Sequence, residues 1–156
     1  MRMAVYQIVK EGDPVLRQNA IEIKEITPSV IRLLDNLKDT LHSTSNGVGL
    51  AAPQIGISKR AVIVETEDDG LFEMVNPVIF AAEGEEEDWE GCLSVPGTEG
   101  RVMRASKIKV RYMDRVGRNL EMMAQGFLAR IIQHETDHLN GILYIDRAQV
   151  INRDLK

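Results

Sequence analysis

The sequence predicts an α+β fold, and three observations support this prediction. Segments with strand character outnumber the helical ones, the turns between them are short, and one long helix comes late in the chain. The length of 156 residues is that of one domain, so we expect a single domain over residues 1–156.

The first predicted helix lies near the N-terminus, in the stretch ITPSVIRLLDNLKDTLHS. Thr27 is a favourable N-cap, and Pro28 suits the first helical position because an N–H would have no helical partner there. The polar, glycine-rich sequence TSNGVG predicts the end of this helix. Its expected buried face carries apolar residues at helical spacing, namely Ile31, Leu34, Leu37 and Leu41.

The middle of the chain predicts strands. RAVIVE, residues 60–65, is a short apolar strand, and the EDDG sequence after it is a turn. Residues 71–82 indicate one or two strands, broken near Asn76-Pro77. The acidic run of residues 83–90 is expected to form a solvated loop. Residues 107–126 predict a hairpin that turns at DRVG.

The charge distribution argues against a nucleic-acid-binding protein. The formal net charge is −5, whereas binding by phosphate neutralisation needs a basic surface. Basic residues do gather within residues 101–111, but there they alternate with apolar ones, as on a solvated strand face. The alternating residues are Lys107, Lys109 and Arg111 against Ile108, Val110 and Tyr112. We therefore expect no sequence-specific nucleic-acid partner.

The chain also lacks the features of a membrane or secreted protein. No apolar run approaches the roughly 20 residues that span a bilayer, and the start MRMAVYQIVK does not have the pattern of a signal peptide. The single cysteine, Cys92, cannot form an internal disulfide, which fits a reducing compartment. We expect a cytoplasmic protein with no membrane partner.

The last predicted helix runs from about Phe127 to Leu139 and is closed by Asn140-Gly141. One stripe along it mixes apolar and ionisable residues at helical spacing: Phe127, Leu128, Ile131, Glu135, His138 and Leu139. The apolar members indicate a buried face, where an unpaired charge is costly.

A metal ion would remove that cost, because His134 and His138 are one helical turn apart and can bind a single ion. The glutamate between them, Glu135, is in the usual position of a general base. The alternative is a solvent-facing helix end that happens to carry histidines. Two of only three histidines in the chain fall in this pattern, which favours a metal site.

A catalytic site of this kind needs a third protein ligand. The downstream residues Asp146 and Asp154 are poor candidates for this ligand. The upstream candidate is Cys92, in WEGCLSVPG. The alternative for a lone cysteine is a buried structural thiol. A thiolate with two imidazoles would suit Fe²⁺, Zn²⁺, Ni²⁺ or Co²⁺, and the ligand types do not choose among them.

The stretch GVGLAAPQIG, residues 47–56, follows the first helix. It could be a mere glycine-rich connector, and its spacing does not fit a phosphate-binding loop. Its small residues would let the backbone approach a ligand closely, and Gln54 offers an amide donor for a developing oxyanion.

Taken together, GVGLAAPQ, EGCLS and QHETDH resemble, in this order and spacing, the three signature motifs of the peptide deformylases. The N-terminal DPVLRQNA is similar to the opening of that family, and the resemblance covers essentially the whole chain. It implies an enzyme that removes the formyl group from formylmethionine on newly synthesised polypeptides, normally with one Fe²⁺ per chain. It also implies antiparallel sheets wrapped around the metal-bearing helix.

The resemblance assigns roles residue by residue. It implies that the metal ligands are Cys92, His134 and His138. Glu135 would be the general acid and base, and Gln54 with the backbone N–H of Leu93 would form the oxyanion hole. Gly49 and Gly91 would hydrogen-bond the substrate backbone. The residues implied to line the methionine pocket are Val48, Phe127 and Ile131.

The sequence allows two interpretations for each of two features near these residues. Asp137 either orients a ligand imidazole from outside the metal shell or is a surface residue. Glu90 and Arg104 form either a buried pair beside the cysteine or two unrelated surface charges.

The expected partners are the nascent formyl-methionyl polypeptide and, as a transient contact, the ribosome. Some relatives dock on the ribosome through a longer C-terminal helix, whereas this sequence ends at INRDLK, which argues against that contact. One rival function is a zinc-dependent peptidase that uses the same helix. The other is a structural metal domain, which would need a fourth protein ligand and no catalytic base.

Overall fold

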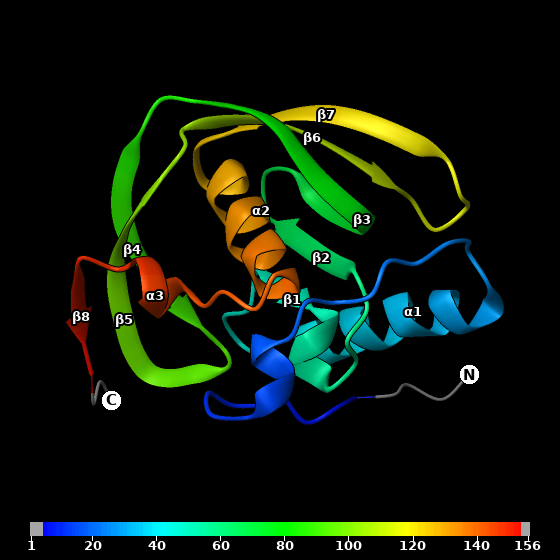
Figure 1. Ribbon diagram of the computed structural model, residues 1–156, viewed down its shortest axis with the longest axis horizontal. Coiled ribbons are helices and arrows are strands. Elements are labelled where there is room, and N and C mark those ends of the chain that lie inside the picture. The colour runs from blue at the N-terminus through cyan, green and yellow to red at the C-terminus, as the bar shows by residue number, and fades with distance from the viewer. Residues whose placement is uncertain (1–4, 154–156) are drawn as a thin grey trace.

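The computed structural model describes residues 5–153, which form two antiparallel sheets and a few helices, as the α+β prediction requires (Figure 1). The helical elements are η1 (Pro14–Arg17), α1 (Pro28–His42), η2 (Ala52–Ile55), α2 (Gly126–Leu139) and α3 (Tyr144–Arg147). The strands are β1 (Gly49–Ala51), β2 (Ala61–Thr66), β3 (Gly70–Glu83), β4 (Glu86–Cys92), β5 (Val95–Arg104), β6 (Lys107–Met113), β7 (Asn119–Gln125) and β8 (Val150–Asn152).

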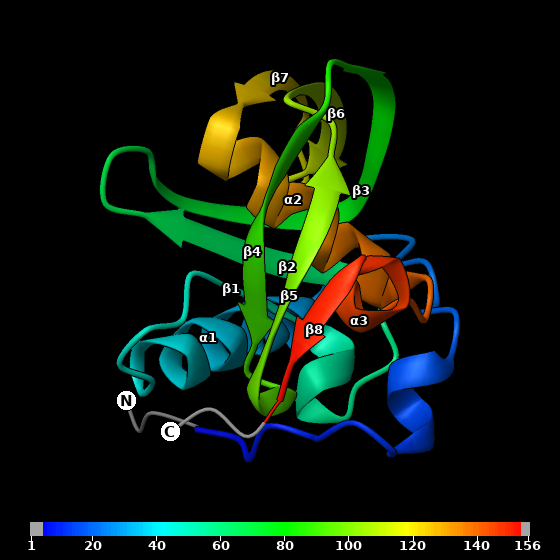
Figure 2. The same cartoon turned by 90° about the vertical axis from the view of Figure 1, so that its left-hand side faces the viewer.

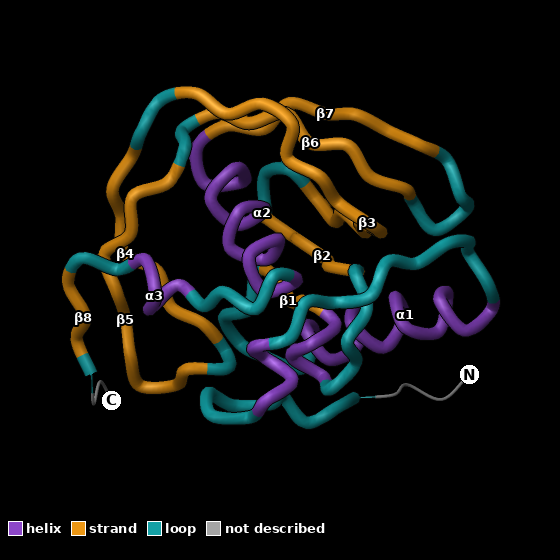
Figure 3. The backbone as a smooth tube through the Cα atoms, viewed as in Figure 1, coloured by secondary structure: helices purple, strands orange, loops and turns teal. Residues whose placement is uncertain are grey.

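The two sheets surround α2. The larger sheet has the order β1-β2-β3-β6-β7 and the smaller one has the order β4-β5-β8, with every neighbouring pair antiparallel. Figures 2 and 3 show α2 enclosed by these strands, while α1 lies on the outer side of the larger sheet. In these orders β1 and β4 are both edge strands, which leaves one side of each without a strand neighbour. No helix within residues 5–153 is long and apolar enough to cross a membrane.

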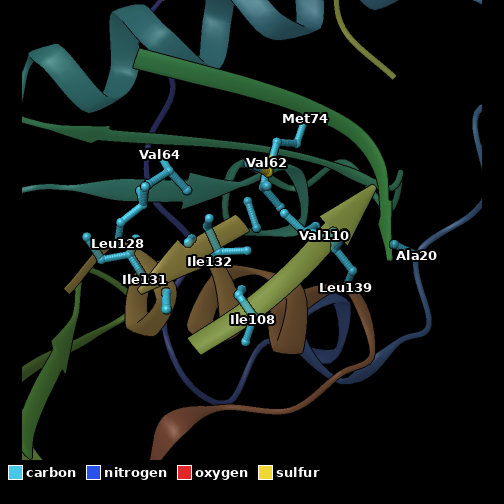
Figure 4. Close-up of a cluster of buried hydrophobic side chains, with 13 residues drawn as sticks. Ala20, Val62, Val64, Met74, Ile108, Val110, Leu128, Ile131, Ile132 and Leu139 are labelled. Carbon is cyan, nitrogen blue, oxygen red and sulfur yellow. The ribbon is translucent and has the colours of Figure 1, made fainter. Parts of the chain in front are cut away.

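Strand β2 shows why RAVIVE is apolar without alternation. Val62 and Val64 pack in a cluster with α2 (Figure 4), whereas Ala61 and Ile63 pack in a second cluster with α1. A strand covered on both faces must be apolar on both. The sheet therefore separates two cores, one on each side.

The first helix follows its prediction in bounds and caps. Thr27 accepts a hydrogen bond from the N–H of Val30, and Pro28 is the first helical residue. The buried face is rotated slightly from the predicted one, because Val30 and Leu33 are buried and Ile31 is only half-buried.

The acidic run of residues 83–90 was wrongly predicted as a loop. Its residues are largely exposed, but Glu86–Cys92 forms strand β4 and pairs with the basic strand β5. Glu87 forms an ion pair with Arg101, at 2.8 Å between Oε1 and Nε. The partner strand supplies opposite charge, and opposite charges on neighbouring strands stabilise a sheet.

The predicted break at Asn76-Pro77 is a bulge within one continuous strand. The register of β3 against β6 shifts between Val75 and Val78, and Asn76 has a left-handed φ of 52°. Asparagine tolerates this conformation better than most residues. Its side chain holds the bulge in place by bonding the backbone N–H and carbonyl of Ile23.

Candidate metal centre and substrate cavity

Three ligand-type side chains meet at one end of β4 and one face of α2. Cys92 is the last residue of β4, and the helical spacing of His134 and His138 puts both imidazoles on its side of α2. The three donor atoms all lie within 4.8 Å of one another. All three predicted ligands are therefore brought together.

The spacing of the donors fits a metal ion. Sγ of Cys92 lies 3.4 Å from Nε2 of His138. A tetrahedral ion with metal–sulfur and metal–nitrogen bonds of about 2.3 and 2.0–2.1 Å would separate these two donors by about 3.5 Å. The donor set of one thiolate and two imidazoles suits a borderline or soft transition metal.

Glu90 holds the imidazole of His134. Its Oε1 lies 2.8 Å from Nδ1 of His134, and both side chains are more than nine-tenths buried. Burial opposes ionisation of Glu90, but hydrogen bonds from Arg104 and His134 outweigh it and keep the pKa of Glu90 well below its usual range. An ionised carboxylate only accepts, so Nδ1 of His134 is the donor and Nε2 is left with its lone pair for a ligand bond.

The centre also favours positive charge. Burial lowers the pKa of His134, but its contacts with Cys92 and Glu90 outweigh burial and hold this pKa well above the ordinary value. The pKa of His138 is instead lowered, first by burial and then by the neighbouring His134. The raised pKa of His134 indicates that positive charge is stabilised at this position, where a divalent cation would supply it.

Glu135 lies beside these donors, on the same helix. It is 4% exposed, and its buried Oε1 has no hydrogen-bond partner among the described residues. Burial raises its pKa to about 7. A carboxylate whose pKa lies near neutrality can both take and return a proton at the pH of the cell.

Gly49 on β1 lies directly against Glu135. A Cβ atom at Gly49 would lie 2.6 Å from Oε2 of Glu135 and 2.9 Å from its Cγ. Any larger residue would therefore displace this carboxylate, which explains a glycine at this position.

Gln54 is held rigidly next to the cysteine. Its Oε1 accepts a hydrogen bond from the N–H of Ala51, and its Nε2 donates to Oγ of Ser94 at 3.1 Å and approaches Sγ of Cys92 at 3.5 Å. The side chain is 1% exposed. Both donors of this amide are engaged, which fixes the side chain of Gln54 beside Cys92.

A cavity of about 380 Å³ opens above the centre. It is bordered by residues 46–49 on the side of β1 and residues 89–93 on the side of β4. Every predicted site residue except His138 is in its lining, including Val48, Gly91, Leu93, Phe127 and Ile131. Figure 4 shows Ile131 and Leu128 at the part of α2 that faces Val64.

Two details differ from the sequence analysis. Phe127 is 59% exposed, so it lies at the mouth of the cavity and not on a buried stripe. Of the two possibilities left open for Asp137, orientation of a ligand imidazole is excluded, because its carboxylate bonds Arg104 and Arg147 and no imidazole among the described residues. The buried pair of Glu90 and Arg104 does form, through two bonds of 2.9 Å.

The downstream residue Asp146 is not part of the centre. Asp146 forms an ion pair with Arg17 and accepts from the N–H of Leu143. Asp154 lies outside the described residues.

Other residues near the centre were not anticipated from the sequence. Arg130 is buried and bonds Glu90, and the ring of Tyr144 stacks on His134 with centroids 5.8 Å apart. Arg130 did give a signal, because it is the one charge within the apolar sequence FLARII. No pattern in the sequence marks Tyr144.

The chain matches known proteins over nearly its whole length. The family model described as polypeptide deformylase matches residues 5–154. A peptide deformylase of Carboxydothermus hydrogenoformans is 54% identical over 97% of this chain and 98% of its own length. One of Desulfitobacterium hafniense is 52% identical over 97% of this chain and 99% of its own length.

Solved structures agree with these matches. A peptide deformylase from Legionella pneumophila superposes with a TM-score of 0.89 at 39% identity, covering 94% of this chain and 87% of that one. A Synechococcus elongatus peptide deformylase, solved in complex with actinonin, gives a TM-score of 0.89 at 38% identity and covers 96% and 82%. These matches do not favour the rival function of a zinc-dependent peptidase. With its Cys92, His134 and His138 centre and these relatives, the chain belongs to the polypeptide deformylase family of hydrolases.

Proposed function

We propose that this enzyme removes the N-formyl group from the N-terminal formylmethionine of newly synthesised polypeptides, using one Fe²⁺ held by Cys92, His134 and His138. The observation that carries the proposal is the meeting of these three donors within 4.8 Å of one another, beside the buried Glu135. Deformylation of nascent chains also implies that the enzyme works in the cytoplasm.

The substrate binds as an added strand between the two sheets. Two observations support this binding mode: β1 and β4 are edge strands, and both strands border the cavity. Backbone groups at Gly49 and Gly91 bond the substrate backbone, as in recognition by strand addition. A related peptide deformylase of Acinetobacter baumannii was solved with Met-Ala-Ser bound, at a TM-score of 0.87 and 38% identity over 94% of this chain and 99% of that one.

The methionine side chain enters the apolar part of the cavity, between Val48, Phe127 and Ile131. All three line the cavity, and an unbranched thioether adapts well to such a surface. A formyl group is small enough to fit beside the donors, whereas an acetyl group adds a methyl next to Glu135 and Gly49.

Glu135 moves the proton in the reaction. An iron ion held by Cys92, His134 and His138 would supply Lewis acidity for activating water near neutral pH and polarising the formyl carbonyl. Glu135 takes a proton from the attacking water and returns it to the departing amine, so formate and a free amino terminus are released. Its pKa of about 7, raised by burial, supports both steps.

Gln54 and the backbone N–H of Leu93 stabilise the negative charge that develops on the formyl oxygen. The support is that Gln54 is buried, that its carbonyl is fixed by Ala51, and that its amide nitrogen lies beside Cys92. A donor that is fixed before the reaction needs no reorganisation when charge appears.

The proposal is tested by formate release from formyl-Met-Ala-Ser by protein purified without oxygen. Acetyl-Met-Ala-Ser and a chelator-treated sample are the controls. We expect rapid release from the formyl peptide alone, loss of activity with the chelator, and decay in air if the ion is iron held by a thiolate. Protein that holds one metal per chain yet releases no formate would refute the proposed substrate.

A further inference from the structure

Arg130 lies where the substrate cavity meets the metal centre. It lines the cavity, yet its side chain is only 6% exposed. An arginine that reaches into the interior of a protein needs partners for its charge and for its donors. The hydrogen-bond partners of Arg130 lie on β4 and β5.

The guanidinium of Arg130 makes three hydrogen bonds. Nη1 donates to Oε2 of Glu90 at 2.6 Å and to the carbonyl of Val102 at 3.0 Å. Nη2 donates to the carbonyl of Glu86 at 2.7 Å. Arg130 therefore ties α2 to both strands of the β4–β5 pair and to the one carboxylate that holds His134.

Each oxygen of Glu90 receives two donors. Oε2 accepts from Arg130 and from Nε of Arg104 at 2.9 Å, and Oε1 accepts from Nη2 of Arg104 at 2.9 Å and from Nδ1 of His134 at 2.8 Å. A carboxylate has about four acceptor sites, so this one is fully used. Arg104 is itself anchored to α2 through Asp137, and Arg130 adds a second, direct anchor from α2 that fixes the plane of the carboxylate.

From this arrangement we propose that Arg130 is a positioning residue for the metal centre. By fixing Glu90, it fixes the ring of His134 with Nε2 directed at Cys92 and His138. Groups that orient a ligand imidazole commonly change metal affinity when they are removed. This inference rests on the proposed metal site and extends it by one further residue.

The test measures Co²⁺ binding to metal-free protein, by competition with a chelator and by the visible absorption of the bound ion. Both readouts work without substrate. We expect Arg130→Met to lower Co²⁺ affinity about tenfold and to shift its absorption bands. Arg130→Lys should be intermediate, because a lysine keeps the charge and one bond to Glu90 but not the planar fork.

The matched control is Arg147→Met. Arg147 is also an arginine of this network, but it bonds Asp137 and not Glu90, and its side chain is 45% exposed. We expect its Co²⁺ affinity and spectrum to match the parent. A loss in Arg147→Met equal to that in Arg130→Met would overturn the proposal, because it would reflect general loosening.

A role for Arg130 confined to the cavity wall gives a different result. Such a residue would change KM for formyl-Met-Ala-Ser and leave Co²⁺ affinity and spectrum at the parent values, and that outcome overturns the inference. If Arg130→Met does not fold, Arg130→Lys decides the matter in the same way. A parent protein that binds no Co²⁺ would instead refute the metal site itself.

Discussion

Helices α1 and α2 are nearly equal in length, at 15 and 14 residues, but they are built differently. Among the six buried residues of α1, only Thr40 is polar. Ten residues of α2 are buried, and half of them are polar: Arg130, His134, Glu135, Thr136 and His138. The difference lies in what surrounds each helix, since α1 has solvent on one side and α2 is enclosed by two sheets (Figure 1).

Helix α1 contributes mainly to stability, whereas α2 carries the residues that can do chemistry. Apolar packing stabilises α1, and its polar residues can stay in water. In α2 the polar residues are in the interior, where each needs a partner, a metal ion or a changed pKa.

The largest effect is expected for Glu135→Gln in α2. The amide fills the same space but cannot carry the proton, so kcat should fall about 10³-fold, within the range of general acid–base catalysis. Steady-state kinetics on formyl-Met-Ala-Ser measure this, with metal content as the control. Full turnover by a metal-loaded variant would contradict the assigned role.

Next comes Glu90→Leu, which leaves the guanidinium groups of Arg104 and Arg130 buried without their shared carboxylate. Breaking a buried ion pair by removing one partner typically costs about 3–5 kcal/mol. Urea unfolding of metal-free protein measures the loss, which excludes any contribution from the ion. An unchanged unfolding free energy would show that these charges find other partners.

In α1 the matching experiment is Leu37→Ala. Leu37 is fully buried in the cluster between α1 and the larger sheet, and removing such a side chain typically costs about 2–5 kcal/mol. The deformylase rate per folded molecule should stay at the parent value at temperatures well below Tm. A fall in kcat with an unchanged unfolding free energy would show that α1 takes part in the reaction and does not only stabilise the fold.

The pH dependence of metal-free stability should reveal the cost of burying Glu135. Because burial raises its pKa from 4.5 to about 7, the folded state keeps the proton at pH values where the unfolded state has lost it. Stability is therefore lost as pH rises between these values, by about 3 kcal/mol in total. We expect Glu135→Gln to gain stability over the parent with rising pH and to level off above pH 7. A difference that does not vary with pH would rule out this cost.

The smallest effect is expected for Thr27→Ala, which removes the cap of α1. Its hydroxyl accepts from the N–H of Val30 at 3.3 Å, and losing such a cap costs about 1 kcal/mol. Thermal unfolding measures the change, and Ser at the same position is the control that keeps the hydroxyl. Activity below Tm should be unaffected, as for Leu37→Ala.

Local signals in the sequence predicted several elements well. The cap and period of α1, the hairpin of β6 and β7, and the bounds of α2 all follow from neighbouring residues. The acidic strand β4 could not be predicted in this way. Its residues favour solvent, and it is a strand because its backbone pairs with β5, which places Arg101 and Arg104 opposite Trp89 and Glu86.

The candidate site could likewise be predicted only in part from the sequence. The residue types and spacing of Cys92, His134, Glu135 and His138 are enough to indicate a metal-binding pattern, because the ligand chemistry restricts which side chains can serve. The support around these residues is only partly visible in the sequence. The pairing of Glu90 with Arg104 is one of two possibilities that the sequence leaves open, and Asp137 bonds arginines and not the imidazole that it could have oriented.

Local signals in the sequence were enough to predict α1 with its cap, the resemblance to a family and the residue types that can hold a metal. The tertiary structure decided which charges are buried and what satisfies them. Glu90 is 14, 40 and 44 residues from Arg104, Arg130 and His134, so no local pattern can place these groups together. The pairing of β4 with β5 brings Arg104 to Glu90, and the packing of α2 between the two sheets brings Arg130 and His134 to the same carboxylate. Burial strengthens these hydrogen bonds.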